Sequence, residues 1–425
     1  MKRYNPVFLI SLMVLGTAIL LASGCGSSRK LSKTDISHFY SEYKYTDYRI
    51  VIFHLNDSVS RAYVSIPIEN FSTVTDNEGG SVSGFRLDWA LYKSFESVEV
   101  IDSSSALVSN ARGADDPMEM LIDFDFRAAY PADYVLKTTL TDIYSKEKPT
   151  VGDFTEVNKQ DRMSAQNFMI VDEDGLPLFS KQLEKGTQFG IRYNRPDAGK
   201  LTVRYYDRIF PVARPPFALD KDRVFRFAAD SLFTVSLSSK GYSDLDVYDK
   251  EGIYHFQADT SMKQGYSVMV FHEGFPGITS PHQAIRPLRY LTSKPEFGKL
   301  FNYDDKKTAV DSFWLERASQ DPERARSMIQ RYYGRVEFAN KHFSSHKVGW
   351  KTDRGIIYII YGPPSYVYRR QGEEEWIYGE PGNPLSIEFD FYRVENPFTN
   401  NDLSLARSPV YKQSWYIAIE NWRRN

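Results

Sequence analysis

Residues 349–355 read Gly-Trp-Lys-Thr-Asp-Arg-Gly, and this stretch joins two strongly apolar patterns near the C-terminus of a 425-residue chain. Its two glycines allow the backbone to turn and to approach a neighbour closely, and Trp350 offers a large apolar surface for burial. Thr352 and Asp353 can accept hydrogen bonds from backbone N–H groups just after them, which is typical of a tight turn. The composition therefore predicts a compact structural junction between two elements.

The same stretch permits a chemical role, with Asp353 as a general base or metal ligand and Arg354 as an anion-binding group. No histidine or second carboxylate stands beside them at catalytic spacing. The chain also lacks a G-x-S-x-G motif, a phosphate-binding Gly-rich loop and a dinucleotide fingerprint. We therefore interpret the junction as structural, and we expect no catalytic residue, no cofactor and no enzymatic activity.

Helical patterns precede the junction. Apolar residues recur at steps of three and four between Lys306 and Gln320, and again between Ala325 and Phe343. The pair Asp321-Pro322 is typical of a helix N-terminus, so the second helix is predicted to span about 20 residues. We expect Gly349 to end this segment with a positive φ.

Strands are predicted after the junction, because short runs rich in isoleucine, tyrosine and tryptophan recur there. Gly355 would let the first strand pack closely, and Gly362-Pro363-Pro364 would end it in a stiff loop. The run Glu373–Glu375 has the composition of solvated charges that lead into a strand. The predicted strands are Gly355–Tyr361, Glu375–Tyr378, Ser386–Phe391 and Trp415–Glu420.

The order of these features resembles the GWxTD-domain family of bacterial envelope proteins. The resemblance rests on Gly349, Trp350, Thr352, Asp353 and Gly355, on the upstream Phe313-Trp314 pair, on Asn340–Phe343, on Gly362-Pro363-Pro364 and on Glu375–Tyr378. It covers about residues 281–425 and implies an envelope location with β-sandwich regions before the module. It implies no reaction.

Between Tyr48 and residue 280 the chain has the pattern of β structure. Runs of alternating apolar and polar residues, such as Phe85–Tyr92 and Tyr134–Leu140, are separated by turn segments, and Val247–Phe256 has the pattern of a hairpin. The predicted fold is multi-domain and mainly β. Two antiparallel, Ig-like β-sandwich domains, 46–160 and 161–280, are followed by a C-terminal α+β GWxTD module, 281–425.

The first 25 residues have the order of a lipoprotein signal. A basic start precedes an apolar run from Val7 to Ala22, and small residues lead to Cys25, the only cysteine of the chain. The apolar run is shorter than the roughly 20 residues that a membrane-spanning helix needs. We expect residues 1–24 to be a signal peptide, Cys25 to be acylated and residues 25–45 to form a lipidated tether. An uncleaved anchor with a chance cysteine is the alternative.

The residues after Cys25 and the charge balance indicate the expected membrane and the expected class of partner. No acidic residue occurs between Cys25 and Lys30, which by analogy with lipoproteins of diderm bacteria favours the outer membrane, facing the periplasm. The near balance of 53 basic and 55 acidic residues argues against a general nucleic-acid binder. Residues 281–425 carry a net positive charge, which could meet an acidic partner or lipid headgroups; a solvated surface without special meaning is the alternative.

Two further patterns suggest metal sites, and for both we favour a structural interpretation. His342 and His346 lie four residues apart, but no HExxH motif accompanies them. The cluster Asp172–Gly175 lacks the spacing of an EF-hand and suits a hairpin turn. We expect no metal site at either place.

The leading functional hypothesis is a non-enzymatic, lipid-anchored scaffold or adaptor subunit of an envelope assembly, held to the membrane through Cys25 and bound to protein partners. One such assembly is a type IX secretion or gliding machine, in which the chain would be an accessory component. The 29 tyrosines and 28 phenylalanines keep open a carbohydrate-binding lipoprotein of a glycan-uptake system. A hydrolase built from scattered carboxylates is a third possibility.

Overall fold

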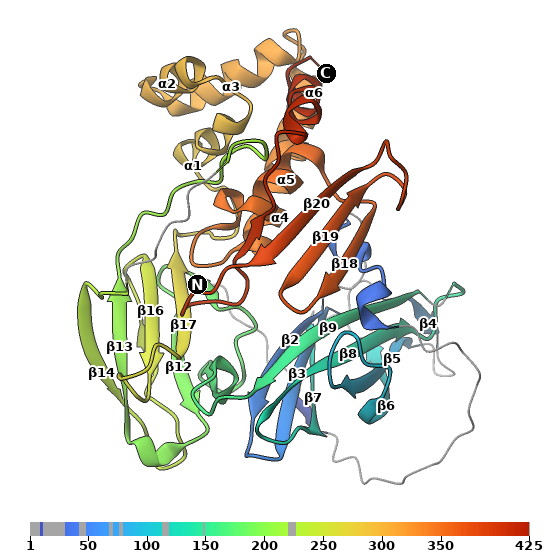
Figure 1. Cartoon of the computed structure of the whole chain (residues 1–425), viewed down its shortest axis with the longest axis vertical. Helices are drawn as coiled ribbons and strands as arrows, with labels where there is room; N and C mark the ends of the chain where they lie inside the picture. Colours follow the sequence, from blue (N-terminus) through green and yellow to red (C-terminus); the bar gives the residue numbers. More distant parts are fainter. Residues whose placement is uncertain are drawn as a thin grey trace.

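Strands make up most of the first two thirds of the chain, and the helices gather in the last third, as the computed structural model shows (Figure 1). The structure describes residues 9–11, 30–41, 48–67, 71–75, 80–112, 119–147, 149–219 and 227–424. Two β regions lie side by side and the helical part stands above them (Figure 1). We call residues 48–159 β region 1, residues 168–271 β region 2 and residues 281–424 the C-terminal module. The predicted mainly β fold with a C-terminal α+β module is confirmed.

β region 1 consists of two sheets packed face to face. One sheet has the order β1-β7-β3-β2; in the other, β5 pairs with β4, β6 and β8, and β8 pairs with β9. Val64 and Ile122 of the first sheet pack against Phe85, Leu87 and Leu140 of the second. The strands are β1 (Leu9–Ser11), β2 (Arg49–His54), β3 (Val59–Pro67), β4 (Thr73–Thr75), β5 (Ser81–Tyr92), β6 (Val100–Arg112), β7 (Glu119–Arg127), β8 (Ala132–Asp142) and β9 (Thr150–Lys159).

β region 2 repeats the two-sheet arrangement, with the orders β10-β12-β15 and β11-β17-β16-β13-β14. Phe168 and Ile191 of the smaller sheet share one apolar core with Val203, Phe256 and Val268 of the larger sheet. The pairing is antiparallel except between β11 and β17. The strands are β10 (Phe168–Val171), β11 (Gln182–Glu184), β12 (Gln188–Tyr193), β13 (Lys200–Tyr206), β14 (Ser231–Ser236), β15 (Asp246–Val247), β16 (Gly252–Gln257) and β17 (Tyr266–Phe271).

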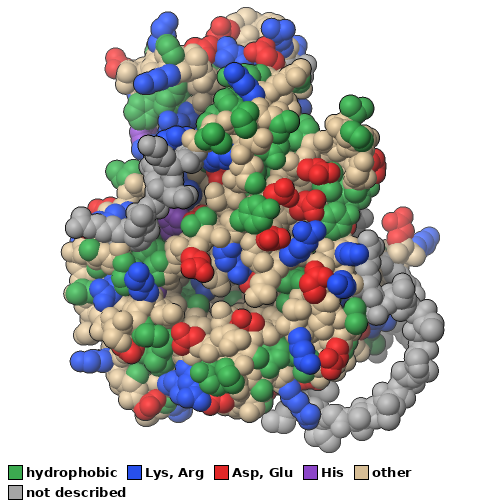
Figure 2. Space-filling model, viewed as in Figure 1, with side chains coloured by type: hydrophobic (Ala, Val, Ile, Leu, Met, Phe, Trp, Pro, Cys, Tyr) green, Lys and Arg blue, Asp and Glu red, His purple; other side chains and the backbone are tan. Residues whose placement is uncertain are grey.

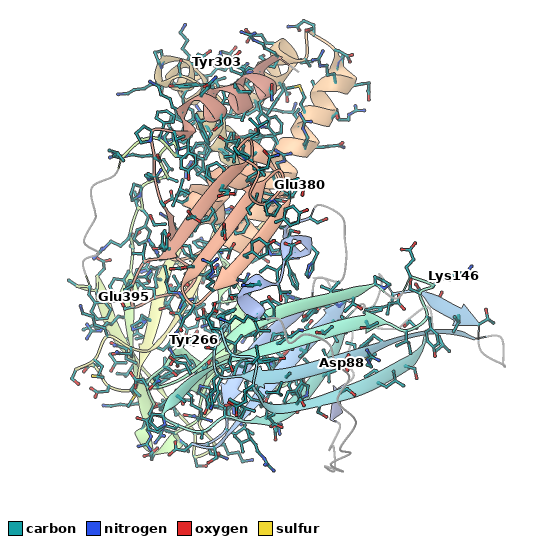
Figure 3. All side chains as sticks on the ribbon, turned by 45° about the vertical axis from the view of Figure 1, so that its right-hand side comes forward. Asp88, Lys146, Tyr266, Tyr303, Glu380 and Glu395 are labelled. Atoms are coloured by element: carbon teal, nitrogen blue, oxygen red, sulfur yellow. The ribbon has the colours of Figure 1, made fainter. Side chains whose placement is uncertain are left out.

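The C-terminal module packs helices against a four-stranded antiparallel sheet of order β18-β19-β20-β21. The helices are α1 (Pro281–Ile285), η6 (Pro287–Tyr290), α2 (Lys294–Asn302), α3 (Lys306–Arg317), α4 (Pro322–Phe343), η7 (Gly349–Lys351), α5 (Asp353–Tyr361) and α6 (Tyr411–Arg424). The strands are β18 (Tyr366–Arg370), β19 (Glu373–Tyr378), β20 (Ile387–Arg393) and β21 (Leu403–Leu405). Tyr303, between α2 and α3, marks the helical tip of the molecule, and Lys146, between β8 and β9, marks the outer edge of β region 1 (Figure 3).

The two predicted helices before the junction are confirmed as α3 and α4. The Asp321 carboxylate caps α4 by accepting hydrogen bonds from the backbone N–H groups of Glu323 and Arg324. Trp314 of α3 is fully buried, and its ring lies 5.3 Å from that of Tyr332 on α4. The predicted helical spacing therefore places the apolar face of α4 in the core.

Three predictions of local structure were wrong. Residues 355–361 and 415–420 were predicted as strands but belong to helices α5 and α6. α5 is buried on every side, so its isoleucine run has no period that would reveal a helix. Residues 247–256 do not form a hairpin, because β15 pairs with β12 whereas β16 pairs with β13 and β17 in the other sheet.

The segment predicted as a polar tether is part of the fold from residue 30 to residue 41. It contains the short helices η1 (Leu31–Lys33) and η2 (Ser37–Tyr40), and Leu31, Ile36 and Tyr40 are buried in the core of the C-terminal module. The Ile36 N–H donates to the Val367 carbonyl at 2.9 Å, and the Val367 N–H donates to the Asp35 carboxylate at 2.9 Å. The segment therefore lies along strand β18.

The three parts of the molecule are held together by both charged and apolar contacts. Arg393 of β20 donates to Glu156 of β9 at 2.6 Å, which links the C-terminal module to β region 1. Phe398 packs with Ile253 and Met269, which links the module to β region 2. Within the described residues, no helix is long and apolar enough to cross a membrane.

Because Ile36 is fully buried, replacing it with alanine should leave a cavity in the C-terminal module. We expect Ile36→Ala to lower the free energy of unfolding by about 2–4 kcal/mol in urea titration. Lys33→Ala, at an exposed position of the same segment, should change that free energy by less than about 0.5 kcal/mol. Equal effects of the two substitutions would show that the segment does not dock.

Candidate functional site

The junction 349–355 is built on two close backbone approaches. A Cβ atom placed on Gly349 would lie 1.7 Å from the Ala339 carbonyl oxygen of α4, and one on Gly355 would lie 1.9 Å from the Gly349 carbonyl oxygen. Neither glycine has a positive φ. Helix α4 ends at Phe343, so the expectation that Gly349 terminates it was wrong. Both glycines are needed for space rather than for an unusual backbone conformation.

Trp350 and Thr352 hold the two turns of the junction. Trp350 is 6% exposed; its N–H donates to the Asn340 side-chain oxygen at 3.1 Å, and its carbonyl accepts from the Tyr290 hydroxyl at 3.0 Å. The Thr352 hydroxyl accepts from the Gly355 N–H at 3.0 Å and donates to the Gly349 carbonyl at 2.8 Å. Thr352 is therefore the N-cap of a helix, where a turn into a strand was expected.

Asp353 joins α5 to the last strand of the sheet through a buried ion pair. Its carboxylate accepts from the Leu405 N–H at 2.9 Å and from the Ser404 hydroxyl at 3.2 Å. The Arg407 guanidinium donates to the same carboxylate at 2.5 Å, with side-chain exposures of 8% for Arg407 and 11% for Asp353. Both carboxylate oxygens of Asp353 thus accept hydrogen bonds from groups of the C-terminal module.

The Arg354 side chain extends to strand β19, where it contacts the buried Glu374. Its guanidinium lies 3.3 Å from the Glu374 carboxylate, which also accepts from the Tyr40 hydroxyl at 2.9 Å and from the Trp376 indole N–H at 2.6 Å. Burial alone would raise the pKa of Glu374, but the charges of Arg354 and Arg369 outweigh it and lower this pKa. Glu374 is 3% exposed, so the interpretation of Glu373–Glu375 as solvated charges was wrong at its middle residue.

Gly362-Pro363-Pro364, at the end of the sequence pattern, follows α5 directly. Gly362 has φ +90°, and its N–H donates to the Tyr358 carbonyl at 2.8 Å. A Cβ atom there would lie 2.6 Å from the Arg335 guanidinium. Pro363 and Pro364 then lead directly into β18. The stiff loop was predicted correctly, although it ends a helix rather than a strand.

The junction also binds the segment 207–217, which rises from β13 of β region 2 to the helices (Figure 1). The Ala213 N–H donates to the Lys351 carbonyl at 2.8 Å. Arg407, already paired with Asp353, donates to the carbonyls of Arg214 and Pro215 at 2.8 and 2.9 Å. The proline-rich linker is therefore held by the backbone and the ion pair of the junction.

Next to the junction, a cleft of about 820 Å³ separates β region 2 from the helices. Its walls come from the end of β13, the ends of β16 and β17, the α1–α2 segment and residues 346–351. On the face drawn in Figure 2, Lys, Arg and His side chains lie where the helical part meets β region 2. The cleft is lined by the cations Arg208, Arg214, Arg286, Arg289, Lys347 and Lys351 and by two carboxylates, Asp207 and Glu251.

Lys351 occupies the unspecified third position of the junction and points its side chain into this cleft. Its ammonium lies 5.5 Å from the centre of the Trp350 ring. Burial, followed by repulsion from Arg286, lowers the pKa of Lys351, and Glu251 partly opposes that effect. None of the cleft cations was identified from the sequence as a functional residue. The position of Lys351 between the motif residues Trp350 and Thr352 could have indicated it.

The other candidate residues make contacts within the fold. His342 stacks on Phe338 with ring centroids 4.1 Å apart, whereas His346 lies 3.5 Å from the Asp402 carboxylate and burial lowers its pKa to about 4. Asp172 accepts two backbone N–H bonds in a turn, as expected. The described residues contain no group of three metal-ligand side chains. Cys25 lies outside the described residues.

Comparison with protein families identifies a GWxTD domain at residues 252–424. The match begins at Gly252, earlier than the expected boundary at 281, and so includes β16 and β17 of β region 2. This extension agrees with the shared core of Ile253, Met269 and Phe398. No curated protein matches the chain.

The close approach at Gly349 gives a direct test of the junction. Gly349→Ala should lower the free energy of unfolding by more than about 3 kcal/mol, because backbone atoms of α4 and η7 must separate. Gly334→Ala, on the exposed face of α4 with nothing within 4 Å, should raise that free energy by about 0.5–1 kcal/mol. Thermal or urea unfolding measures both, and a tolerated Gly349→Ala would refute the close packing.

The Asp353–Arg407 pair gives a second test. Asp353→Asn should lower the free energy of unfolding by about 3–5 kcal/mol, because it leaves the buried Arg407 charge without its counter-charge. In a double-mutant cycle, Asp353→Asn/Arg407→Gln should lose less free energy of unfolding than the sum of the losses in the two single variants. Asp311→Asn, which removes the exposed Lys307–Asp311 pair, should cost less than about 1 kcal/mol. Equal losses in the two aspartate variants would mean that the buried pair is not structural.

Proposed function

We propose that this chain is a non-enzymatic, lipid-anchored scaffold or adaptor subunit of a cell-envelope protein assembly. The acylated Cys25 holds it to the outer membrane, facing the periplasm, and its protein partners belong to a large envelope machine of the type IX secretion or gliding kind. The removal of residues 1–24 during maturation would also remove the short strand β1 from the edge of β7.

The observation that carries this proposal is the docking of residues 30–41 on the C-terminal module. Lys30 lies five positions after Cys25, and five residues span at most about 18 Å. A lipid on Cys25 would therefore hold the module close to the membrane surface, with little freedom to turn. A short, docked connection suits a component that must present a fixed surface to a membrane-embedded partner.

The contacts between the parts support the same role. Arg369 of β18 lies 3.2 Å from Asp153 of β9, and the junction holds the linker of β region 2 through Ala213 and Arg407. Both β regions are thus fixed to the module that carries the anchor. A rigid arrangement of three parts is what a spacer between two partners requires.

The alternatives fit these observations less well. Sugar-binding faces commonly use exposed tryptophan rings, yet the six tryptophans of this chain are at most 8% exposed: Trp89, Trp314, Trp350, Trp376, Trp415 and Trp422. A carboxylate-based hydrolase needs two acidic groups that converge in a pocket. The cleft beside the junction instead presents mainly cations.

The anchor is tested by Cys25→Ser. The variant should lack acyl groups in mass spectrometry and should leave the membrane fraction or accumulate as the precursor, because no other cysteine can accept the lipid. Unchanged fractionation at mature length would contradict the lipoprotein proposal. Ser32→Ala, in the docked segment, serves as a control that should remain membrane-bound.

The scaffold role is tested by affinity purification of the tagged chain from gently solubilised membranes. We expect membrane proteins to co-purify with the lipidated chain and to be lost with Cys25→Ser, and deletion of the gene to impair secretion or motility. A chain that migrates alone, in cells whose secretion and motility survive its deletion, would contradict this role.

A further inference from the structure

The cleft beside the junction is lined by more cations than carboxylates. Among the described residues, no carboxylate lies within 4.0 Å of Arg286, Arg289, Lys347 or Lys351. Arg208, in the same cleft, differs because it is paired with Asp230. Elsewhere in the module, buried guanidinium groups meet carboxylates, as at Arg354, Arg369 and Arg407. These four cations, which line one cleft, thus make no salt bridge within the part of the chain that the structure describes.

Holding these charges together is unfavourable without an anion. Lys351 is half-buried, and Arg286, Arg289 and Lys347 all disfavour its charged form. Glu251 is the one carboxylate that acts on Lys351 in the opposite direction. A bound anion would lower the repulsion among all four groups, and the attraction would be strongest at the half-buried Lys347 and Lys351.

Aromatic rings hold two of the cations in place. The Arg289 guanidinium lies 5.2 Å from the centre of the Phe297 ring, and the Lys351 ammonium lies over Trp350. The cleft lip also exposes apolar surface, since Ile209 is 95% exposed and Phe301 is 37% exposed. Cations positioned beside rings and apolar side chains suit a ligand with a charged group and an apolar part.

We propose that this cleft is a binding site for an organic anion in which a phosphate or carboxylate group adjoins an apolar portion. The volume of about 820 Å³ lies within the range of pockets that hold small molecules. The anionic group lies between Arg286 and Arg289 on one wall and Lys347 and Lys351 on the other. The ligand is either a free small molecule or the headgroup end of an anionic lipid, because both carry this chemistry.

Three probes separate these sources when titrated calorimetrically into the full chain. Inorganic phosphate supplies the charge alone, 1-naphthyl phosphate adds an apolar ring, and dihexanoyl-phosphatidylglycerol is a short-chain lipid. We expect 1-naphthyl phosphate or the lipid to bind at least about tenfold more tightly than phosphate, and added salt to weaken both. The tighter of the two identifies the source.

Matched variants locate the binding. Lys347→Gln/Lys351→Gln should weaken binding by at least about tenfold, whereas Lys299→Gln/Lys412→Gln removes the same charge outside the cleft and should leave binding unchanged. Glu251→Gln should strengthen binding, because it removes a carboxylate from the cleft. Unfolding could not produce that gain, so Glu251→Gln keeps the test informative if the double variant is unstable.

Two outcomes would overturn the site. One is the absence of binding by any probe at about 1 mM, where even a weak specific site would respond. The other is equal affinity in the wild type, the cleft double variant and Glu251→Gln, which would place the binding elsewhere. Neither outcome bears on lipidation, which fractionation measures separately.

Discussion

The close contact of the Gly349 backbone with α4 is the constraint on which the rest of the C-terminal module depends. With no side chain between them, η7 lies directly against Ala339, and the side chains of residues 350–354 are then directed to different neighbours. Trp350 and Thr352 complete the two turns, Asp353 reaches β21 and Arg354 reaches β19. A short stretch of chain thereby organises two helices and a sheet, which explains why so many of its side chains are buried yet polar.

The same junction connects parts that are far apart in the sequence. Through Lys351 and Arg407 it holds the linker of β region 2, and through Arg354 and Glu374 it reaches Tyr40 of the N-terminal segment. Because buried charges are stable only when each has a partner, these contacts favour one arrangement of the parts over others. The position of any lipid on Cys25 relative to the β regions would follow from this arrangement.

The junction combines structural contacts with one side chain of the cleft that we propose as a binding site. Its glycines, Thr352 and Asp353 contact groups inside the protein, whereas the Lys351 backbone holds the linker and its side chain lines the cleft beside the Trp350 ring. The position that the GWxTD pattern leaves unspecified is thus the one whose side chain would contact a ligand in the proposed site.

The sequence by itself determined those elements whose formation depends on residues close together in the chain. Asp321-Pro322 and the spacing behind it predicted α4, alternation predicted the strands of both β regions, and the motif predicted a buried junction. Only the tertiary structure decided that the isoleucines of α5 form a helix, that Glu374 is buried and that residues 30–41 dock on β18. It also brought Arg286, Arg289, Lys347 and Lys351 to one cleft. Caps and periodicity depend on near neighbours, whereas burial and the pairing of charges depend on residues that the fold brings together from distant parts of the chain.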